Sequence, residues 1–192
     1  SDQTPQVFGY FKQLFAQVSN PPLDAIREEL VTSVETFIGS EGNLFDETPE
    51  QCHQLKVKEP ILTNRDLERI RGIREGRLKA KTLSTLFRVD EGPGALRLAM
   101  DTLCRQASQA VAEGCPILVL SDRGVDAQHA PIPSLLATAG VHHHLIREGS
   151  RTRVGLVVES GEPRGVSHFA LLFGYGAAAV NPYLALETLA QM

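Results

Sequence analysis

Cysteine is scarce in this chain: its 192 residues include three, Cys52, Cys104 and Cys115, and no two of them have the CxxC spacing. An odd set without such a pair indicates neither a disulfide framework nor a cysteine-ligated metal site. Cys104 falls among the apolar positions of a predicted helix and Cys115 opens an apolar run, so we expect both to be ordinary buried thiols. This usage favours a reducing compartment, the cytoplasm, or the plastid stroma if the source is a photosynthetic eukaryote.

The chain also lacks an excess of charge and any long apolar run. Nineteen Lys and Arg oppose 23 Asp and Glu, and the net charge of −4 gives no basic footprint for nucleic acid. The longest apolar runs, such as 116–120 and 169–173, are far shorter than the roughly 20 residues that a membrane helix requires. The amino terminus has neither an initiator Met nor a signal pattern. We therefore predict no nucleic-acid or membrane partner, and expect a piece of a longer chain.

The first part of the chain, residues 1–81, is predicted to be mainly helical. Helix start signals recur along it, at Thr4-Pro5, Asp24, Thr48-Pro49 and Thr63. The second of these helices is expected to end at Gly39 and to place apolar side chains on one face, those of Ile26, Leu30, Val34, Phe37 and Ile38.

From Thr82 to residue 192, predicted strands and helices alternate. The strands are expected at 82–87, 115–120, 153–158 and 177–180, and the helices at 93–114, 132–148, 163–173 and from Pro182 onward. The unbroken apolar character of 115–120 is typical of a strand buried on both faces. The alternation predicts one α/β domain over residues 1–192, with a parallel sheet of βα repeats in a Rossmann-like or partial-barrel, three-layer arrangement.

Polar side chains follow two of the predicted strands. Ser121, Asp122 and Arg123 come after 115–120, and Glu159 and Arg164 come after 153–158. Because ligands bind parallel sheets at the carboxyl ends of the strands, these groups could hold an anion. A free-standing small-molecule-binding domain or enzyme using these loops is thus the alternative hypothesis. The same residue types also form helix caps and loop salt bridges, and this structural interpretation is favoured.

Two other motifs are interpreted as structural. The consecutive residues His142, His143 and His144 point about 100° apart on a helix, so they cannot converge on one metal ion, and we predict no bound metal. Residues 174–179 spell G-x-G-x-x-A, but a helix precedes them and a strand follows, the reverse of a dinucleotide site. We interpret them as a helix C-cap and a tight turn. No catalytic residue is predicted in the chain.

The segment around two consecutive prolines is the remaining candidate. Pro21 and Pro22 fix the backbone between two predicted helices and hold Ser19 and Asn20 at a rigid junction. Rigid polar groups of this kind suit the wall of a conduit.

Several segments together resemble one known family. The run Tyr10 to Asp24, YFKQLFAQVSNPPLD, followed by Ile26-Arg27-Glu28-Glu29-Leu30, is similar to the signature of the glutamate synthase central domain. Ser19 and Leu23 replace the family's more usual Thr and Ile. Further blocks are similar in the same order along the chain: LVLSDRG from Leu118, IPSLLA from Ile132, VHHHLI from Val141, GYGA from Gly174 and NPYLA from Asn181.

The resemblance implies a non-catalytic linker within a large oxidoreductase. In that family an amidotransferase domain frees ammonia from glutamine, and an FMN domain with an iron–sulfur cluster uses the ammonia and a reductant to convert 2-oxoglutarate into a second glutamate. The expected partners are therefore these two domains of the same chain, and no cofactor is expected in residues 1–192. The resemblance implies that channel or interface residues are Gln17, Ser19, Asn20, Pro21, Pro22, Asp24 and Arg27.

Overall fold

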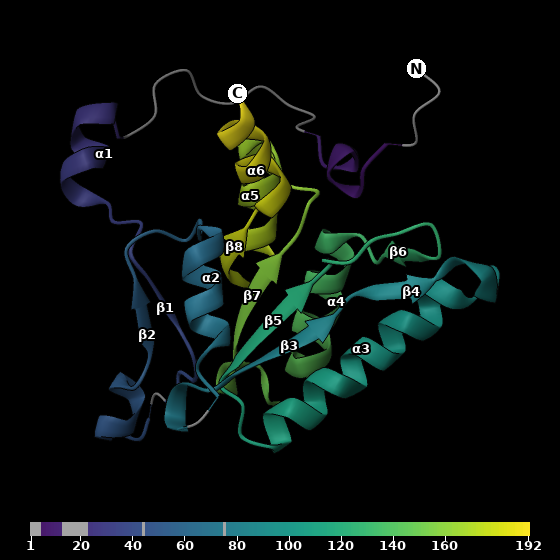
Figure 1. Ribbon diagram of the computed structural model, residues 1–192. Helices are drawn as coiled ribbons and strands as arrows, with labels where there is room; N and C mark the ends of the chain where they lie inside the picture. Colours follow the sequence, from purple (N-terminus) through teal and green to yellow (C-terminus); the bar gives the residue numbers. More distant parts are fainter. Residues whose placement is uncertain (1–4, 13–22, 44, 75) are drawn as a thin grey trace.

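The computed structural model of the chain describes residues 5–12, 23–43, 45–74 and 76–192 (Figure 1). The α-helices are α1 (Ala25–Val31), α2 (Asn64–Arg71), α3 (Ala95–Ala112), α4 (Ser134–Arg147), α5 (Val166–Gly174) and α6 (Tyr183–Gln191). The strands are β1 (Thr36–Ile38), β2 (Leu55–Val57), β3 (Ala80–Ser84), β4 (Leu86–Arg88), β5 (Ile117–Ser121), β6 (His129–Pro131), β7 (Gly155–Glu159) and β8 (Ala177–Asn181). Short 3-10 turns lie at Val7–Tyr10, Pro49–Cys52, Gly76–Leu78, Val89–Glu91 and Arg151–Arg153.

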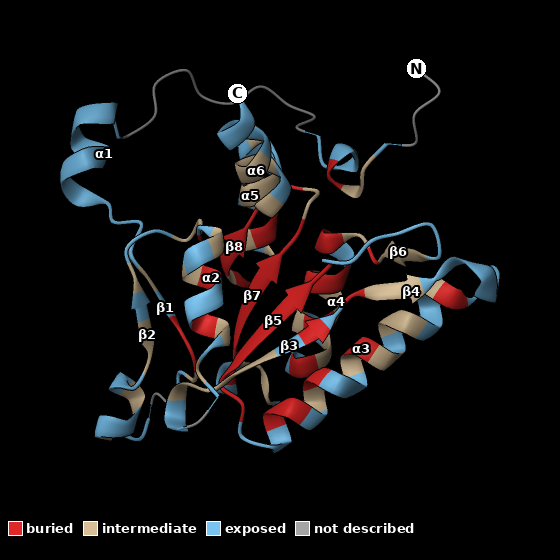
Figure 2. Ribbon diagram, viewed as in Figure 1, coloured by how far each residue is buried: buried red, intermediate tan, exposed pale blue. Residues whose placement is uncertain are grey.

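A four-stranded parallel sheet forms the centre of the molecule. Its strand order is β3-β5-β7-β8, and every residue of β5 and β7 is buried (Figure 2). The apolar runs Ile117–Ser121 and Gly155–Glu159 explain this position, because a strand covered on both faces needs apolar side chains at successive residues. The predicted α/β class with parallel βα repeats is confirmed.

Side chains of alternate strand residues belong to two different cores, one on each face of the sheet. Leu118, Leu120 and Leu156 pack with buried residues of α3 and α4. Ile117, Val119 and Val157 pack instead with Leu67 and Ile70 of α2 and with Ile38 of β1. The molecule therefore has three layers, with α3 and α4 on one face of the sheet and α2 and the β1–β2 pair on the other (Figure 1).

The order of the strands in the sheet follows their order in the chain. The helices that connect them, α3, α4 and α5, lie on one face, because Leu172 of α5 shares a core with Leu135 of α4 and with Val158 and Val180 of the sheet. This arrangement is that of a partial barrel. A doubly wound sheet has a point where the strand order reverses, and its ligand crevice lies there. The β3-β5-β7-β8 sheet has no such reversal.

The second predicted helix is wrong in its second half. Helix α1 ends at Val31, and Thr36–Ile38 forms a strand that pairs antiparallel with Leu55–Val57. The apolar spacing fitted a helix, but Ile38 is fully buried while Ile26 and Leu30 are 75% and 79% exposed, so they do not share one buried face. The β-branched and aromatic Thr36-Phe37-Ile38 is a good strand sequence, and the partner strand decides its conformation.

Other strands and helices begin and end at residues different from those predicted. The predicted strand 82–87 is divided at Thr85 into β3 and β4, and β4 pairs antiparallel with β6, which was not predicted. The interpretation of residues 174–179 is confirmed: α5 ends at Gly174, and Gly176 has the positive φ of +105° that a tight turn requires. No helix in the described part of the chain is both long and apolar enough to cross a membrane.

Gly155 lies where the β1 strand crosses the start of β7, and it gives a test of this packing. An added Cβ would lie 2.6 Å from the Gly39 nitrogen and 2.8 Å from Cγ2 of Ile38. We expect Gly155→Ala to lower the free energy of unfolding by about 1–3 kcal/mol, measured by urea unfolding, because the backbone must move apart. Gly174→Ala is the control, since no atom lies within 4 Å of its added Cβ. Equal midpoints for the two variants would contradict the packing described.

Candidate functional site

The carboxyl end of the sheet is organised around the buried side chain of Glu159, the last residue of β7. This side chain is 1% exposed. Its Oε2 accepts hydrogen bonds from the hydroxyl of Ser121 and from Arg71, and its Oε1 accepts one from Nε of Arg123 at 2.8 Å. Ser121 and Glu159 are paired residues at the ends of β5 and β7, so the parallel register brings them together. We call Glu159, Ser121, Arg71 and Arg123 the strand-end cluster.

Each arginine of the strand-end cluster also bonds a second carboxylate at its solvent side. Arg71 pairs with Glu68 at 2.8 Å, and Arg123 pairs with Glu187 of α6 at 3.0 Å. Burial alone would lower the pKa of both guanidinium groups, but these hydrogen bonds outweigh it, and both pKa values lie above the ordinary value. The guanidinium of Arg123 also stacks on the ring of Tyr183, 4.0 Å from its centroid. The positive charges are therefore already neutralised within the chain.

Asp122 lies in the same loop and bonds groups of the loop that follows β7. Its Oδ2 accepts a hydrogen bond from Ser160 Oγ at 2.6 Å, and its carboxylate accepts another from the Gly161 backbone nitrogen at 3.1 Å. Burial raises the pKa of Asp122, and the bonds from Ser160 and Gly161 oppose that rise. Burial and the neighbouring Asp122 charge in turn raise the pKa of the Tyr183 hydroxyl. Asp122 thus ties the β5 loop to the β7 loop.

Little space remains between these groups. The cavity bordered by Asp122, Ser134, Glu159 and Ser160 has a volume of about 10 Å³, which is the size of one water molecule. The hydroxyl of Ser134 is buried there and has no hydrogen-bond partner among the described residues. A substrate or nucleotide cannot fit at this point. The strand-end cluster has the geometry of a structural ion-pair network.

The sequence predicted part of this network. Ser121, Asp122, Arg123 and Glu159 do meet at the carboxyl ends of the strands. Arg164 is exposed, and among the described residues only its backbone nitrogen is bonded, to His168 at 3.3 Å. Four contributors were missed, Glu68 and Arg71 of α2 and Tyr183 and Glu187 of α6. They lie on helices far away in the sequence, and no local pattern distinguishes them from solvent-facing residues.

The consecutive histidines have separate surroundings. Nδ1 of His142 accepts a hydrogen bond from Arg151 at 2.9 Å, and burial together with the Arg151 charge lowers the pKa of this histidine. His144 lies 2.7 Å from the hydroxyl of Ser108, and His143 is exposed. In the described part of the chain, no three His, Cys, Asp or Glu side chains converge as metal ligands would.

The predicted channel residues are only partly described. Gln17, Ser19, Asn20, Pro21 and Pro22 lie outside the described residues. Asp24 is the N-cap of α1 and accepts hydrogen bonds from the backbone nitrogens of Ile26 and Arg27, at 3.1 and 2.9 Å. The predicted cap is thus confirmed. The side chain of Arg27 is 68% exposed and makes one loose contact, 3.6 Å to Asp24.

The sequence similarity to known proteins extends over the whole chain. The model of the glutamate synthase central domain matches residues 1–192. The chain belongs to this family. A glutamate synthase [NADPH] large chain of Bacillus subtilis is 45% identical over 100% of the chain, and a glutamate synthase [NADH] of Schizosaccharomyces pombe is 41% identical over 100%. A ferredoxin-dependent glutamate synthase of Pyropia yezoensis is 41% identical over 98%. The chain spans only 12%, 9% and 12% of the lengths of these relatives.

The contribution of the buried Glu159 carboxylate to the stability of the central domain can be tested. Changing Glu159→Gln removes the negative charge and leaves Arg71 and Arg123 without it, so we expect a loss of about 3–5 kcal/mol in the free energy of unfolding. Glu187→Gln is the matched control, because Glu187 bonds the same Arg123 from a position that is 42% exposed. Such a surface pair should contribute no more than about 1 kcal/mol. Urea unfolding of both variants measures the loss of unfolding free energy. Equal losses would contradict the role assigned to Glu159.

The buried Asp122 predicts a specific pH dependence. Its pKa is raised in the folded central domain, so the folded state holds its proton more tightly than the unfolded state. The stability of the wild type relative to Asp122→Asn should therefore be highest below the unfolded pKa of about 3.9 and should fall as the pH rises through the folded pKa. Asp126 is the control of opposite sign, since hydrogen bonds from Gln128 and His129 lower its pKa. A pH-independent difference for Asp122→Asn would contradict the burial effect.

Proposed function

We propose that this central domain acts as a non-catalytic scaffold in a glutamate synthase, connecting the glutamine amidotransferase and FMN-containing synthase domains and contributing to the wall of the internal ammonia channel. The reaction of the whole enzyme would be the conversion of glutamine, 2-oxoglutarate and a reductant into two glutamates. The family assignment is the basis of the proposal, and the geometry of the described residues supports it in three ways.

The first support is helix α1, which carries the proposal furthest. None of its seven residues is buried (Figure 2). Ile26, Leu30 and Val31 are 75%, 79% and 67% exposed, and Leu23 just before the helix is 43% exposed. Apolar side chains gathered on one short element mark an interaction surface. Because this helix directly follows the segment 17–24, we propose that it docks against a neighbouring domain beside the ammonia passage.

The second support is that the charged groups of the strand-end cluster are paired with one another or with Glu68 and Glu187. The strand-end cluster is neutralised internally and the adjoining cavity holds about 10 Å³. The sheet also lacks the order reversal that creates a ligand crevice in doubly wound folds. These observations favour a scaffold over the alternative of a free-standing enzyme that uses residues 121–123 and 159–164.

The third support concerns the cofactors that the parent enzyme is proposed to carry. An iron–sulfur cluster needs several cysteine thiolates around one point. In the described chain Cys52 is exposed, Cys104 is half-buried on α3, and Cys115 is buried before β5, and no group of three metal-binding side chains is formed. The described residues do not fit such a cluster. We therefore propose that the cluster lies in another domain of the parent chain, as the family resemblance also implies for FMN.

The relatives suggest that the reductant is selected elsewhere. Proteins named for NADPH, for NADH and for ferredoxin match this chain at 45%, 41% and 41% identity. The similarity hardly changes with the named electron donor. We infer that the central domain serves the same purpose with each of them.

The channel role is tested by filling the passage in the full-length enzyme. Ser19→Trp adds a large side chain to the proposed wall, so glutamine hydrolysis should continue while glutamate formation falls and free ammonia appears. The measurement is the ratio of glutaminase to synthase rates. Ser167→Trp, at an exposed position of α5, is the control and should leave the ratio at one. Tight coupling at normal rates in Ser19→Trp would refute the channel role.

A further inference from the structure

Strand β3 forms an outer edge of the parallel sheet. It pairs with β5 on one side, and no strand in the described part of the chain pairs with its other side. In a strand, the backbone groups of successive residues point to alternate edges. The hydrogen bond from the Thr85 nitrogen to the Ser121 carbonyl, 2.8 Å, shows that Thr85 points toward β5. Thr82 and Ser84 therefore direct their N–H and C=O groups outward.

The outward groups of these two residues are unpaired in the described structure. The neighbouring outward N–H, that of Ala80, donates to the Ile73 carbonyl at 2.8 Å, but no described group bonds the nitrogens of Thr82 and Ser84. The opposite edge of the sheet is treated differently. There Val180 of β8 donates to Pro60 at 2.7 Å and accepts from Leu62 at 2.8 Å. One edge is closed by the chain itself, and the other is open.

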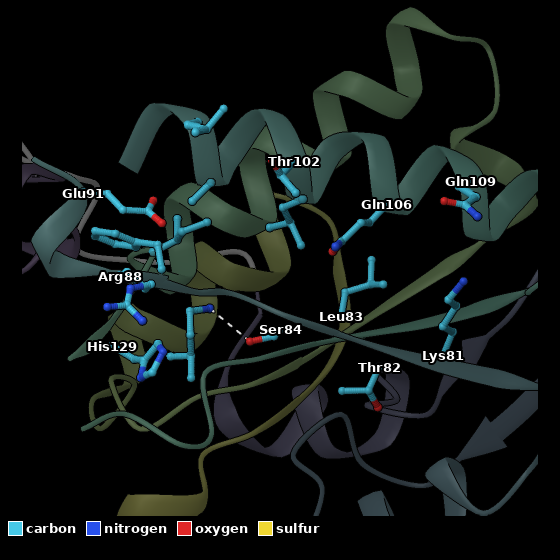
Figure 3. A pocket seen from close by; sticks show the side chains of 16 residues that line it. Lys81, Thr82, Leu83, Ser84, Arg88, Glu91, Thr102, Gln106, Gln109 and His129 are labelled. Carbon is cyan, nitrogen blue, oxygen red and sulfur yellow. Dashed lines mark hydrogen bonds between the residues drawn. The ribbon is translucent and has the colours of Figure 1, made fainter. Parts of the chain in front are cut away.

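A groove runs along the open edge, between β3 and α3. It has a volume of about 680 Å³ and is bordered by four consecutive strand residues, Lys81 to Ser84, as expected where a strand is reached from its edge. Figure 3 shows Thr102, Gln106 and Gln109 of α3 facing this strand. One end of the groove combines Phe87 and the 58% exposed Leu98 with the charged side chains of Arg88 and Glu91, and the other end carries Lys81 and Gln109.

We propose that an extended segment of the full-length polypeptide, from outside these 192 residues, occupies this groove and pairs with β3 as an additional strand. The inference rests on the proposed function, in which the central domain is one part of a longer chain. The relatives are about eight to eleven times as long as this chain, so such segments are abundant. Main-chain hydrogen bonds from Thr82 and Ser84 hold the segment, and the groove selects apolar side chains near Leu98 and polar ones near Gln106.

An outward-facing proline gives a selective test. In the full-length protein, Thr82→Pro removes one outward N–H and places a ring in the groove, while the bonds of β3 to β5 come from Lys81 and Leu83. Thr82→Ala is the matched control because it keeps the N–H. Hydrogen exchange read by mass spectrometry should show a slow Ser84 amide in the wild type and in Thr82→Ala. In Thr82→Pro, Ser84 and one segment outside residues 1–192 should lose protection together.

The wild-type measurement alone can overturn the proposal, even if Thr82→Pro does not fold. A Ser84 amide that exchanges as fast as that of Gly92, in an exposed turn, would show that the edge is open to water. Protection that depends on protein concentration, with a doubled mass in sedimentation, would mean that a second copy occupies the groove and would also refute it. The result is separate from that of Ser19→Trp, because strand addition at β3 and tight coupling of the two activities can each fail alone.

Discussion

The complete burial of β5 and β7 is the constraint on which the rest of the structure depends. A parallel strand with no exposed residue must be covered on both faces. The connecting helices α3, α4 and α5 cover one face. Each returns the chain to the amino-terminal end of the sheet, where the next parallel strand begins. The other cover has to come from the residues before β3, and α2 with the β1–β2 pair provides it. The β1–β2 pair and α2 are therefore an integral layer of the fold.

The same constraint explains what the sequence could predict. Apart from β6 and the division of 82–87 into β3 and β4, the strands and helices from residue 82 onward were predicted, because each has a strong period or an unbroken apolar run. Thr36–Ile38 was assigned to a helix because its apolar residues fitted that period equally well. Its partner lies 17 or more residues away in the chain, at Leu55–Val57, and no local pattern reveals that pairing.

The sequence predicted those members of the strand-end cluster that lie at or directly after the ends of the strands. Ser121, Asp122, Arg123 and Glu159 meet because register brings the ends of parallel strands together. Arg71, Tyr183 and Glu187 join them only through the packing of α2 and α6. Glu68 and Glu187 bind the solvent sides of Arg71 and Arg123, so neither guanidinium is left free to hold an anion. Whether the strand-end cluster is a binding site or a structural network thus depends on residues that the sequence did not indicate.

The bond between Arg71 and Glu159 spans 88 residues of chain. Contacts of such separation carry a large loop-closure cost and form slowly. During synthesis the strand-end cluster lacks the outer partner of Arg123 until α6, which carries Glu187, has left the ribosome. The central domain would therefore acquire its final form only after nearly all of residues 1–192 have been translated.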